Sequence, residues 1–123
     1  MVHVAISDIF ETSQKALEKH GAKAWIAAHV ADAVAKSESV GNRICGLYYL
    51  ESYCLQLQSG RVNGDVEPLV TQPREALVHV DSRYGFAQPA FARGLPLAIE
   101  TAQKLGVSTL SIGHAHTCTS LGY

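Results

Sequence analysis

The sequence predicts an α+β fold, in which N-terminal helices pack with a small mixed sheet that carries a βαβ-like unit. Three observations predict this class. Apolar residues recur at helical spacing through the first half of the chain. Short apolar runs between turn signals follow the Asn63-Gly64 pair. The last three expected elements come in the order strand, helix, strand, which is the order of a βαβ unit.

The first half of the chain predicts three helices, over residues 8–20, 22–38 and 46–58. Ser7 and Asp8 carry side-chain oxygens that can cap the first helix. Gly21 follows Lys19 and His20, a pattern typical of a helix end. Before these helices, residues 2–6 alternate weakly in hydropathy and predict a short edge strand.

The second half predicts strands over 67–71, 76–80 and 107–113, and a helix over 88–104. The Asn63-Gly64 pair favours the tight turn that separates the two halves. The helix contains Gly94 and Pro96, which predict a kink. Residues 76–80 and 107–112 are almost continuously apolar, so we expect both strands to be buried on both faces.

Composition and charge exclude several classes of protein. The 123 residues fit one domain, residues 1–123, and 47% hydrophobic with 17% charged residues excludes intrinsic disorder. A net charge of −1 gives no electrostatic footprint for nucleic acid or an anionic membrane. No apolar stretch is long enough to span a bilayer, and the first residues do not form a signal peptide. Three cysteines without framework spacing favour a reducing compartment, so we expect a cytoplasmic protein.

A metal site is one hypothesis for the end of the chain. His114, His116 and Cys118 alternate, so an extended backbone would point all three to one side. Imidazole and thiolate are good zinc ligands, but a structural zinc site needs a fourth ligand. The alternative is that these are loop residues after a strand.

Nucleophilic catalysis and ligand binding are further hypotheses. His116 with Cys118 or Cys45 could make a base and a nucleophile, or the thiols could be inert. Tyr48, Tyr49 and Tyr53 could line a ligand pocket or simply pack. Neither G-x-G-x-x-G nor G-x-x-x-x-G-K-[ST] occurs, so no known motif cradles a dinucleotide.

Two longer motifs carry a family resemblance. They are Ser59-Gly60-Arg61-Val62-Asn63-Gly64 and the run Val80 to Phe91, which contains Gly-Phe-Ala-Gln-Pro. With them, the chain from Ile6 to Tyr123 resembles the N-terminal part of the malate/L-lactate dehydrogenase-like NAD(P)-dependent oxidoreductases. This non-Rossmann family includes ureidoglycolate dehydrogenase, diketogulonate reductase and the piperideine-2-carboxylate reductases.

The resemblance implies site positions. The family's Ser-His-Gly motif falls on Ile44-Cys45-Gly46, so Cys45 stands at the histidine. The arginine that faces the substrate carboxylate falls on Tyr49, and the helix tyrosine is kept as Tyr53. The acid/base histidine of the Asn-Ser-x-His motif falls on Thr117, next to His116. The catalytic positions are therefore Cys45, Tyr49 and Thr117, and the implied substrate-binding residues are Tyr49, Tyr53 and His116.

These positions predict a truncated, diverged relative. The family's NAD(P)-binding domain would follow Tyr123, so we expect the isolated chain to bind no cofactor and to lack hydride-transfer activity. One alternative is a subunit of a split oxidoreductase, completed by a separately encoded cofactor domain. Others are a small-molecule binding module and the metal protein described above.

The resemblance and the apolar strands together predict assembly. Family members are dimers, and strands that are apolar on both faces would expose a large patch in a monomer. We therefore expect a homo-oligomer, most simply a dimer, with the first helix, the second helix or the sheet edge in its interface.

Overall fold

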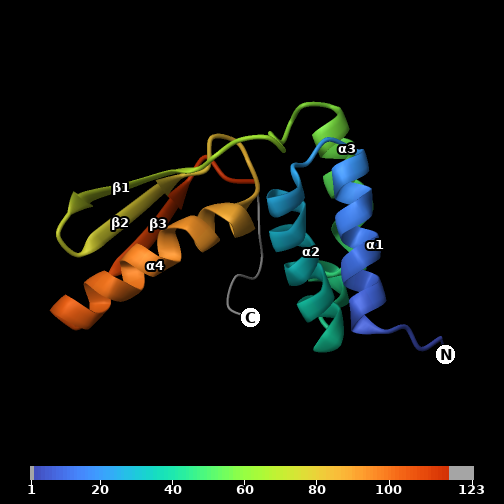
Figure 1. Ribbon diagram of the computed structural model, residues 1–123, viewed down its shortest axis with the longest axis horizontal. Coiled ribbons are helices and arrows are strands. Elements are labelled where there is room, and N and C mark those ends of the chain that lie inside the picture. The colour runs from blue at the N-terminus through green and yellow to red at the C-terminus, as the bar shows by residue number, and fades with distance from the viewer. Residues whose placement is uncertain (1, 117–123) are drawn as a thin grey trace.

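The computed structural model describes residues 2–116 and confirms the α+β class (Figure 1). Helices α1 (Ile6–Lys19), α2 (Ala24–Ser39) and α3 (Leu50–Gln58) form a helical half. Strands β1 (Leu69–Arg74), β2 (Leu77–Asp81) and β3 (Thr109–Gly113), with α4 (Ala87–Leu105) between the last two, form a sheet half. In Figure 1 the two halves extend in different directions from a common junction. Within the described residues, no helix combines the length and apolar character needed to cross a membrane.

The helical half holds the main apolar core. α1 lies against α2, and α3 adds buried side chains from its inward face (Figure 1). The fully buried residues that share this core include Leu17, Ile26, Val30 and Val34. Their spacing follows the helical repeat, which is why the sequence pattern located these helices.

The start of the chain differs from its prediction. Residues 2–5 form no strand, and α1 begins at Ile6 with Ala5 as N-cap and no side-chain capping bond. The predicted caps Ser7 and Asp8 are therefore wrong, because both residues lie inside the first turn. At that place the negative charge of the Asp8 carboxylate interacts favourably with the positive end of the helix dipole.

The third helix begins later than expected. Residues 43–49 form two 3₁₀ turns, η1 (Arg43–Cys45) and η2 (Leu47–Tyr49), and α3 starts only at Leu50. The Glu38 carboxylate accepts a hydrogen bond of 2.8 Å from the Leu47 amide. A Cβ on Gly46 would collide with the same carboxylate. The carboxylate thus occupies the space beside the turn and ties it to the end of α2.

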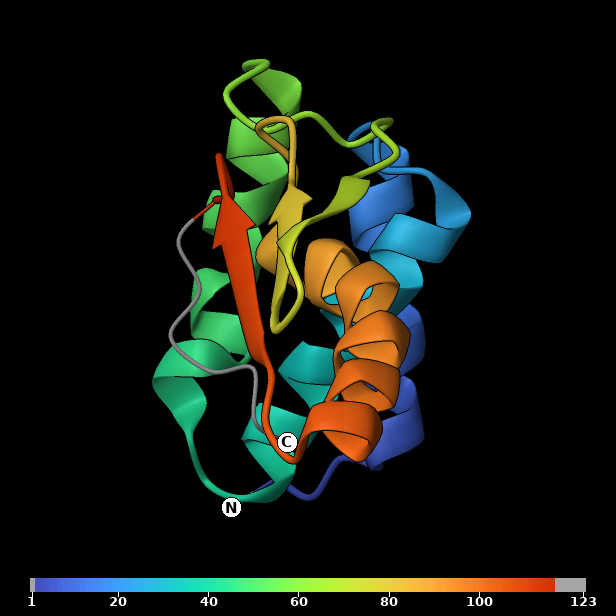
Figure 2. The ribbon, with the colours of Figure 1, turned by 90° about the vertical axis from the view of Figure 1, so that its left-hand side faces the viewer.

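The sheet is mixed, with strand order β1-β2-β3 (Figure 2). β1 pairs antiparallel with β2, and β2 pairs parallel with β3 across α4, which confirms the βαβ unit. The strand predicted over 67–71 lies instead at Leu69–Arg74, with Pro73 at a register irregularity of this edge strand. Pro96 lies inside α4, which continues to Leu105. The kink itself stays a prediction.

The expectation that two strands are buried on both faces is wrong. Val78 and Val80 of β2 are fully buried on the α4 side, where Gly94 lets the helix approach closely. None of the five residues of β3 is buried. The opposite face carries the alternate residues of the strands, and most of them are polar: Thr71, His79, Asp81, Thr109 and Ser111. Leu69 and Leu77 lie on the same face, so it is mostly rather than wholly polar.

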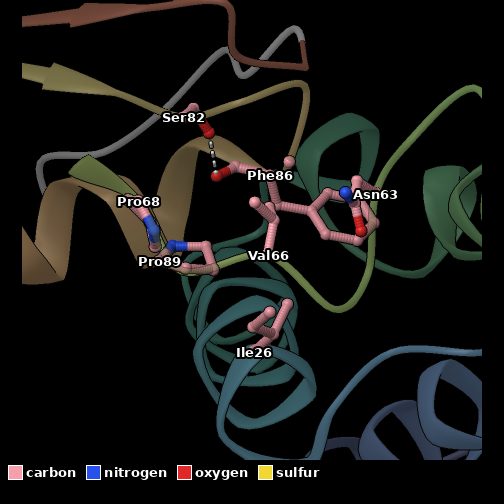
Figure 3. A pocket seen from close by; sticks show the side chains of 8 residues that line it. Ile26, Asn63, Val66, Pro68, Ser82, Phe86 and Pro89 are labelled. Atoms are coloured by element: carbon pink, nitrogen blue, oxygen red, sulfur yellow. Dashed lines mark hydrogen bonds between the residues drawn. The ribbon is translucent and has the colours of Figure 1, made fainter.

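The junction between the halves is tightly packed. Figure 3 shows Ile26 of α2 below Val66 and Phe86, with Pro68 and Pro89 to one side. This hollow leaves no volume for a water-sized molecule. The buried Ser82 hydroxyl donates to the Phe86 carbonyl at 3.0 Å and fixes the turn into α4. The junction therefore holds the two halves, and the residues at their boundary, in fixed positions.

Candidate functional site

Four rings meet where α3, the start of α4 and the segment after β3 come together. We call Tyr49, Tyr53, Phe86 and His116 the aromatic cluster. The rings of Tyr53, Phe86 and His116 contact one another edge to face, with centroids 5.5 to 5.7 Å apart. Tyr49 stacks on Tyr53 at 6.2 Å with planes inclined by 19°. Offset and edge-to-face contacts of this kind are the favoured geometries of aromatic pairs.

Burial differs across the cluster. Phe86 is 2% exposed and Tyr53 is 8% exposed, so both belong to the core of the helical half. Tyr49 is 40% exposed, and its ring contacts that of Tyr48, which is more exposed still. The cluster is thus a packed floor with one aromatic side open to solvent.

His116 is held by the backbone as well as by rings. Beyond the strand ends, β2 and β3 continue as two loops joined by three hydrogen bonds. Ser82 N donates to Gly113 O at 2.9 Å, Tyr84 N to His114 O at 2.8 Å, and His116 N to Gly85 O at 2.9 Å. These bonds carry the chain from β3 to the aromatic cluster.

A second group of polar and aromatic side chains lies along the same loops. His114 Nδ1 lies 3.1 Å from Asp81 Oδ1, and its ring stacks on Tyr84 with centroids 5.2 Å apart. The Arg83 amide donates to the same Asp81 oxygen at 2.8 Å. The bond from Arg83, and then the one from His114, lower the pKa of Asp81 below its ordinary value.

The structure brings together three of the residues proposed from sequence. Tyr49, Tyr53 and His116 all belong to the aromatic cluster, although they come from segments far apart in the chain. Cys45 lies in η1 and is half-buried, with its amide directed at Asn42 Oδ1. Thr117 and Cys118 lie outside the described residues. The roles of all these residues stay predictions.

The extended conformation behind the metal hypothesis does not form. His114 has a φ of +49°, so the alternation of β3 stops at Gly113. Its ring contacts Tyr84, whereas the His116 ring contacts Tyr53 and Phe86. Within residues 2–116, no group of three or more His, Cys, Asp or Glu residues could hold a metal ion.

Cys54 is the buried one of the two cysteines among residues 2–116. Burial raises the pKa of the Cys54 thiol on α3, which disfavours the thiolate there. This agrees with an inert thiol that packs in the core of the helical half.

Comparison with known proteins gives the family. Residues 4–123 match the family described as malate/L-lactate dehydrogenase. The chain belongs to this family. A Δ1-pyrroline-2-carboxylate/Δ1-piperideine-2-carboxylate reductase of Pseudomonas putida is 29% identical over 121 residues, which are 98% of this chain and 36% of the reductase. A (2R)-3-sulfolactate dehydrogenase (NADP⁺) of Chromohalobacter salexigens is 38% identical over 101 residues, which are 82% of this chain and 30% of that enzyme.

A solved structure of this family agrees in fold. The Δ1-piperideine-2-carboxylate reductase of Pseudomonas syringae superposes with a TM-score of 0.90 at 30% identity, and covers 94% of this chain and 35% of the reductase. The malate dehydrogenase of Pyrococcus horikoshii, 23% identical with a TM-score of 0.85, shows the same fold. The chain therefore spans about a third of the length of these relatives.

Sequence reasoning missed several residues of this site. Phe86 contributes a ring to the cluster, and Asp81 and Tyr84 hold His114. All three lie in the motif from Val80 to Phe91 that carried the resemblance to the dehydrogenase family. That motif could have pointed to a functional loop. Its position beside α3 and the segment after β3 is known only from the fold.

Two hollows lie among residues 2–116, away from the aromatic rings of Tyr49, Tyr53 and His116. The junction hollow has no free volume, and another between β1 and α4 encloses about 240 Å³. Ligand pockets usually enclose about 300 to 1,000 Å³. The β1–α4 hollow is lined by Glu75 and Glu100 as well as Lys104, a poor environment for phosphate groups.

Proposed function

We propose that this chain is the substrate-side part of an NAD(P)-dependent oxidoreductase for small 2-oxo or cyclic 2-imino acids. The 123 residues alone hold the ligand at the aromatic cluster and do not transfer hydride. The observation that carries this proposal is the convergence of Tyr49, Tyr53, Phe86 and His116 from three separate segments. The names of the relatives, which specify cyclic imino acids and a sulfonated 2-hydroxy acid, support the substrate class.

The proposed reaction has three chemical requirements. The carbon of a C=N or C=O group accepts hydride from a reduced nicotinamide, the nitrogen or oxygen takes a proton, and a cation pairs with the carboxylate. In this chain His116 is the imidazole of the aromatic cluster, so it is the proposed proton-handling group. Tyr49, at the position of the family's arginine, offers a phenol instead of a cation.

The replacements explain why we expect no turnover. A phenol at Tyr49 can hydrogen-bond a carboxylate but supplies no positive charge, so it orients the substrate more weakly than a guanidinium would. A thiol at Cys45 does not supply the imidazole that the family carries at this position.

Activity and binding are measured separately. NADH and NADPH oxidation by the purified chain is followed with pyruvate, 2-oxoglutarate and Δ1-piperideine-2-carboxylate, and the expected rate equals that without protein. Robust turnover would overturn the expected inactivity. Titration with the same acids in heteronuclear NMR is expected to shift signals of Tyr49, Tyr53 and His116. Tyr49→Ala should weaken these shifts, whereas Val107→Ala, which changes an exposed side chain between α4 and β3, should retain them. Absence of shifts for every acid would overturn the binding role.

A second candidate is a subunit completed by a separately encoded cofactor domain. Such a domain would supply the part of each relative, about two thirds of its length, that these 123 residues do not cover. Co-expression with the remaining two thirds of the Pseudomonas putida reductase tests complementation. The expected result is a co-purifying complex with NADPH oxidation, and failure to co-purify counts against this candidate.

The homo-oligomer also stays a proposal. Several apolar side chains at one end of the helical half are exposed, namely Val40, Ile44, Leu47 and Tyr48. Since the free sheet face is mostly polar, these side chains rather than the sheet are the proposed interface. Sedimentation at micromolar concentration should give about twice 13.2 kDa. A stable 13.2 kDa species would contradict the proposal.

A further inference from the structure

The loops that follow β2 and β3 hold unusual backbone conformations. Within the described residues, the non-glycine residues with positive φ are Arg83 at +50°, Tyr84 at +64° and His114 at +49°. Left-handed conformations are unfavourable for side chains of this size and persist only where surrounding contacts impose them. Tyr84 and His114 are in direct contact, and Arg83 adjoins them. Such outliers concentrate at functional sites, so this region requires a physical explanation.

One carboxylate accounts for much of the arrangement. Asp81 Oδ1 accepts from the Arg83 amide at 2.8 Å, which folds the loop after β2 back on itself. The same oxygen lies 3.1 Å from His114 Nδ1 in the loop after β3. The His114 ring in turn stacks on Tyr84. Asp81 thus connects two loops that are more than thirty residues apart in the chain.

The connection extends to the aromatic cluster. Tyr84 N bonds to His114 O, and two residues further along the chain His116 N bonds to Gly85 O. The position of His116 therefore depends on the alignment of both loops. Asp81 is connected to His116 through His114 and the loop backbone.

We propose that Asp81 is a positioning residue, which clamps the loop after β3 through His114 so that the His116 ring lies against Tyr53 and Phe86. The functional meaning of this position rests on the proposed function, in which His116 handles a proton. The positioning itself can be measured without ligand. The Asp81 carboxylate is charged at neutral pH, as this clamp requires, and its hydrogen bonds to Arg83 and His114 lower its pKa further.

The test uses the full chain and two-dimensional NMR. In the unmodified protein, nuclear Overhauser cross peaks should connect the His116 ring to the Tyr53 and Phe86 rings. Asp81→Ala is expected to abolish these cross peaks and to leave the amide signals of α1 and α2 in place. The matched control is Asp65→Ala, which removes a carboxylate paired with Lys23 in the helical half and should retain the cross peaks. Cross peaks retained in a folded Asp81→Ala protein would overturn the proposal.

A second variant keeps the proposal testable if Asp81→Ala fails to fold. His114→Ala leaves the Asp81–Arg83 bond in place and removes the ring that links Asp81 to the second loop, together with its stack on Tyr84. It should also abolish the His116 cross peaks, and their retention would overturn the proposal. The two proposals fail separately. Loss of ligand-induced shifts in the unmodified chain contradicts the proposed function, whereas unchanged cross peaks in these variants contradict the role of Asp81.

Discussion

The helical half and the sheet half bury their apolar residues in different ways. In the helical half, three helices enclose side chains such as Leu17, Ile26 and Val30 from all sides. In the sheet half, α4 covers one face of the sheet, and the other face is mostly polar. The helical half therefore resembles a complete small core, whereas the sheet half is a single layer with a helix on one side.

Phe86 shows where the two halves meet. It belongs to the sheet half by sequence, yet its ring packs in the core of the helical half. The aromatic cluster forms at this point, because the loops after β2 and β3 end there. Because Phe86 comes from the sheet half and is buried in the helical half, the site depends on the junction rather than on either half alone.

The largest expected effect comes from the enclosed core. Leu17 is 0% exposed, so Leu17→Ala should lower the free energy of unfolding by about 2–5 kcal/mol. Ile99 of α4 is 49% exposed, and Ile99→Ala should change it by about 0.5 kcal/mol or less. Urea unfolding followed by circular dichroism measures both. Equal losses would contradict the difference in burial between these two side chains.

A smaller effect is expected where α4 meets the sheet. A Cβ on Gly94 would press against Val80 and Leu110, so Gly94→Ala should cost about 1–3 kcal/mol despite its better helix propensity. Gln103→Ala on the exposed side of the same helix is the control, with an expected change within about 0.5 kcal/mol. If Gly94→Ala were stabilising, the one covered face of the sheet would be loosely packed.

The smallest effect is a pH dependence at the loops. Asp81 has a lowered pKa in the folded chain, so its charged form stabilises the fold. That contribution is complete above the ordinary carboxyl pKa of about 4 and is lost as the pH falls through the lower folded value. The difference in melting temperature between the unmodified chain and Asp81→Asn should therefore shrink from about pH 6 to about pH 3. A difference that widens on acidification would have the wrong sign.

Local patterns in the sequence were sufficient to predict much of the fold. The helical repeat located α1, α2 and α4, and the strand–helix–strand order predicted the βαβ unit. The motif from Val80 to Phe91 identified the family. These features depend on neighbours along the chain, either through hydrogen bonds within a helix or through a contiguous turn, so they can be deduced from the order of residues.

Features that depend on distant partners required the tertiary structure. The turn at residues 43–49 is held by the Glu38 carboxylate, which lies beside Gly46. Among the described residues, α4 packs on one face of the strands, so that face is the buried one. His116 joins Tyr53 and Phe86 because hydrogen bonds between two loops align it there. Periodicity records which residues are apolar, but contacts between segments far apart in the chain determine what covers them and which side chains meet.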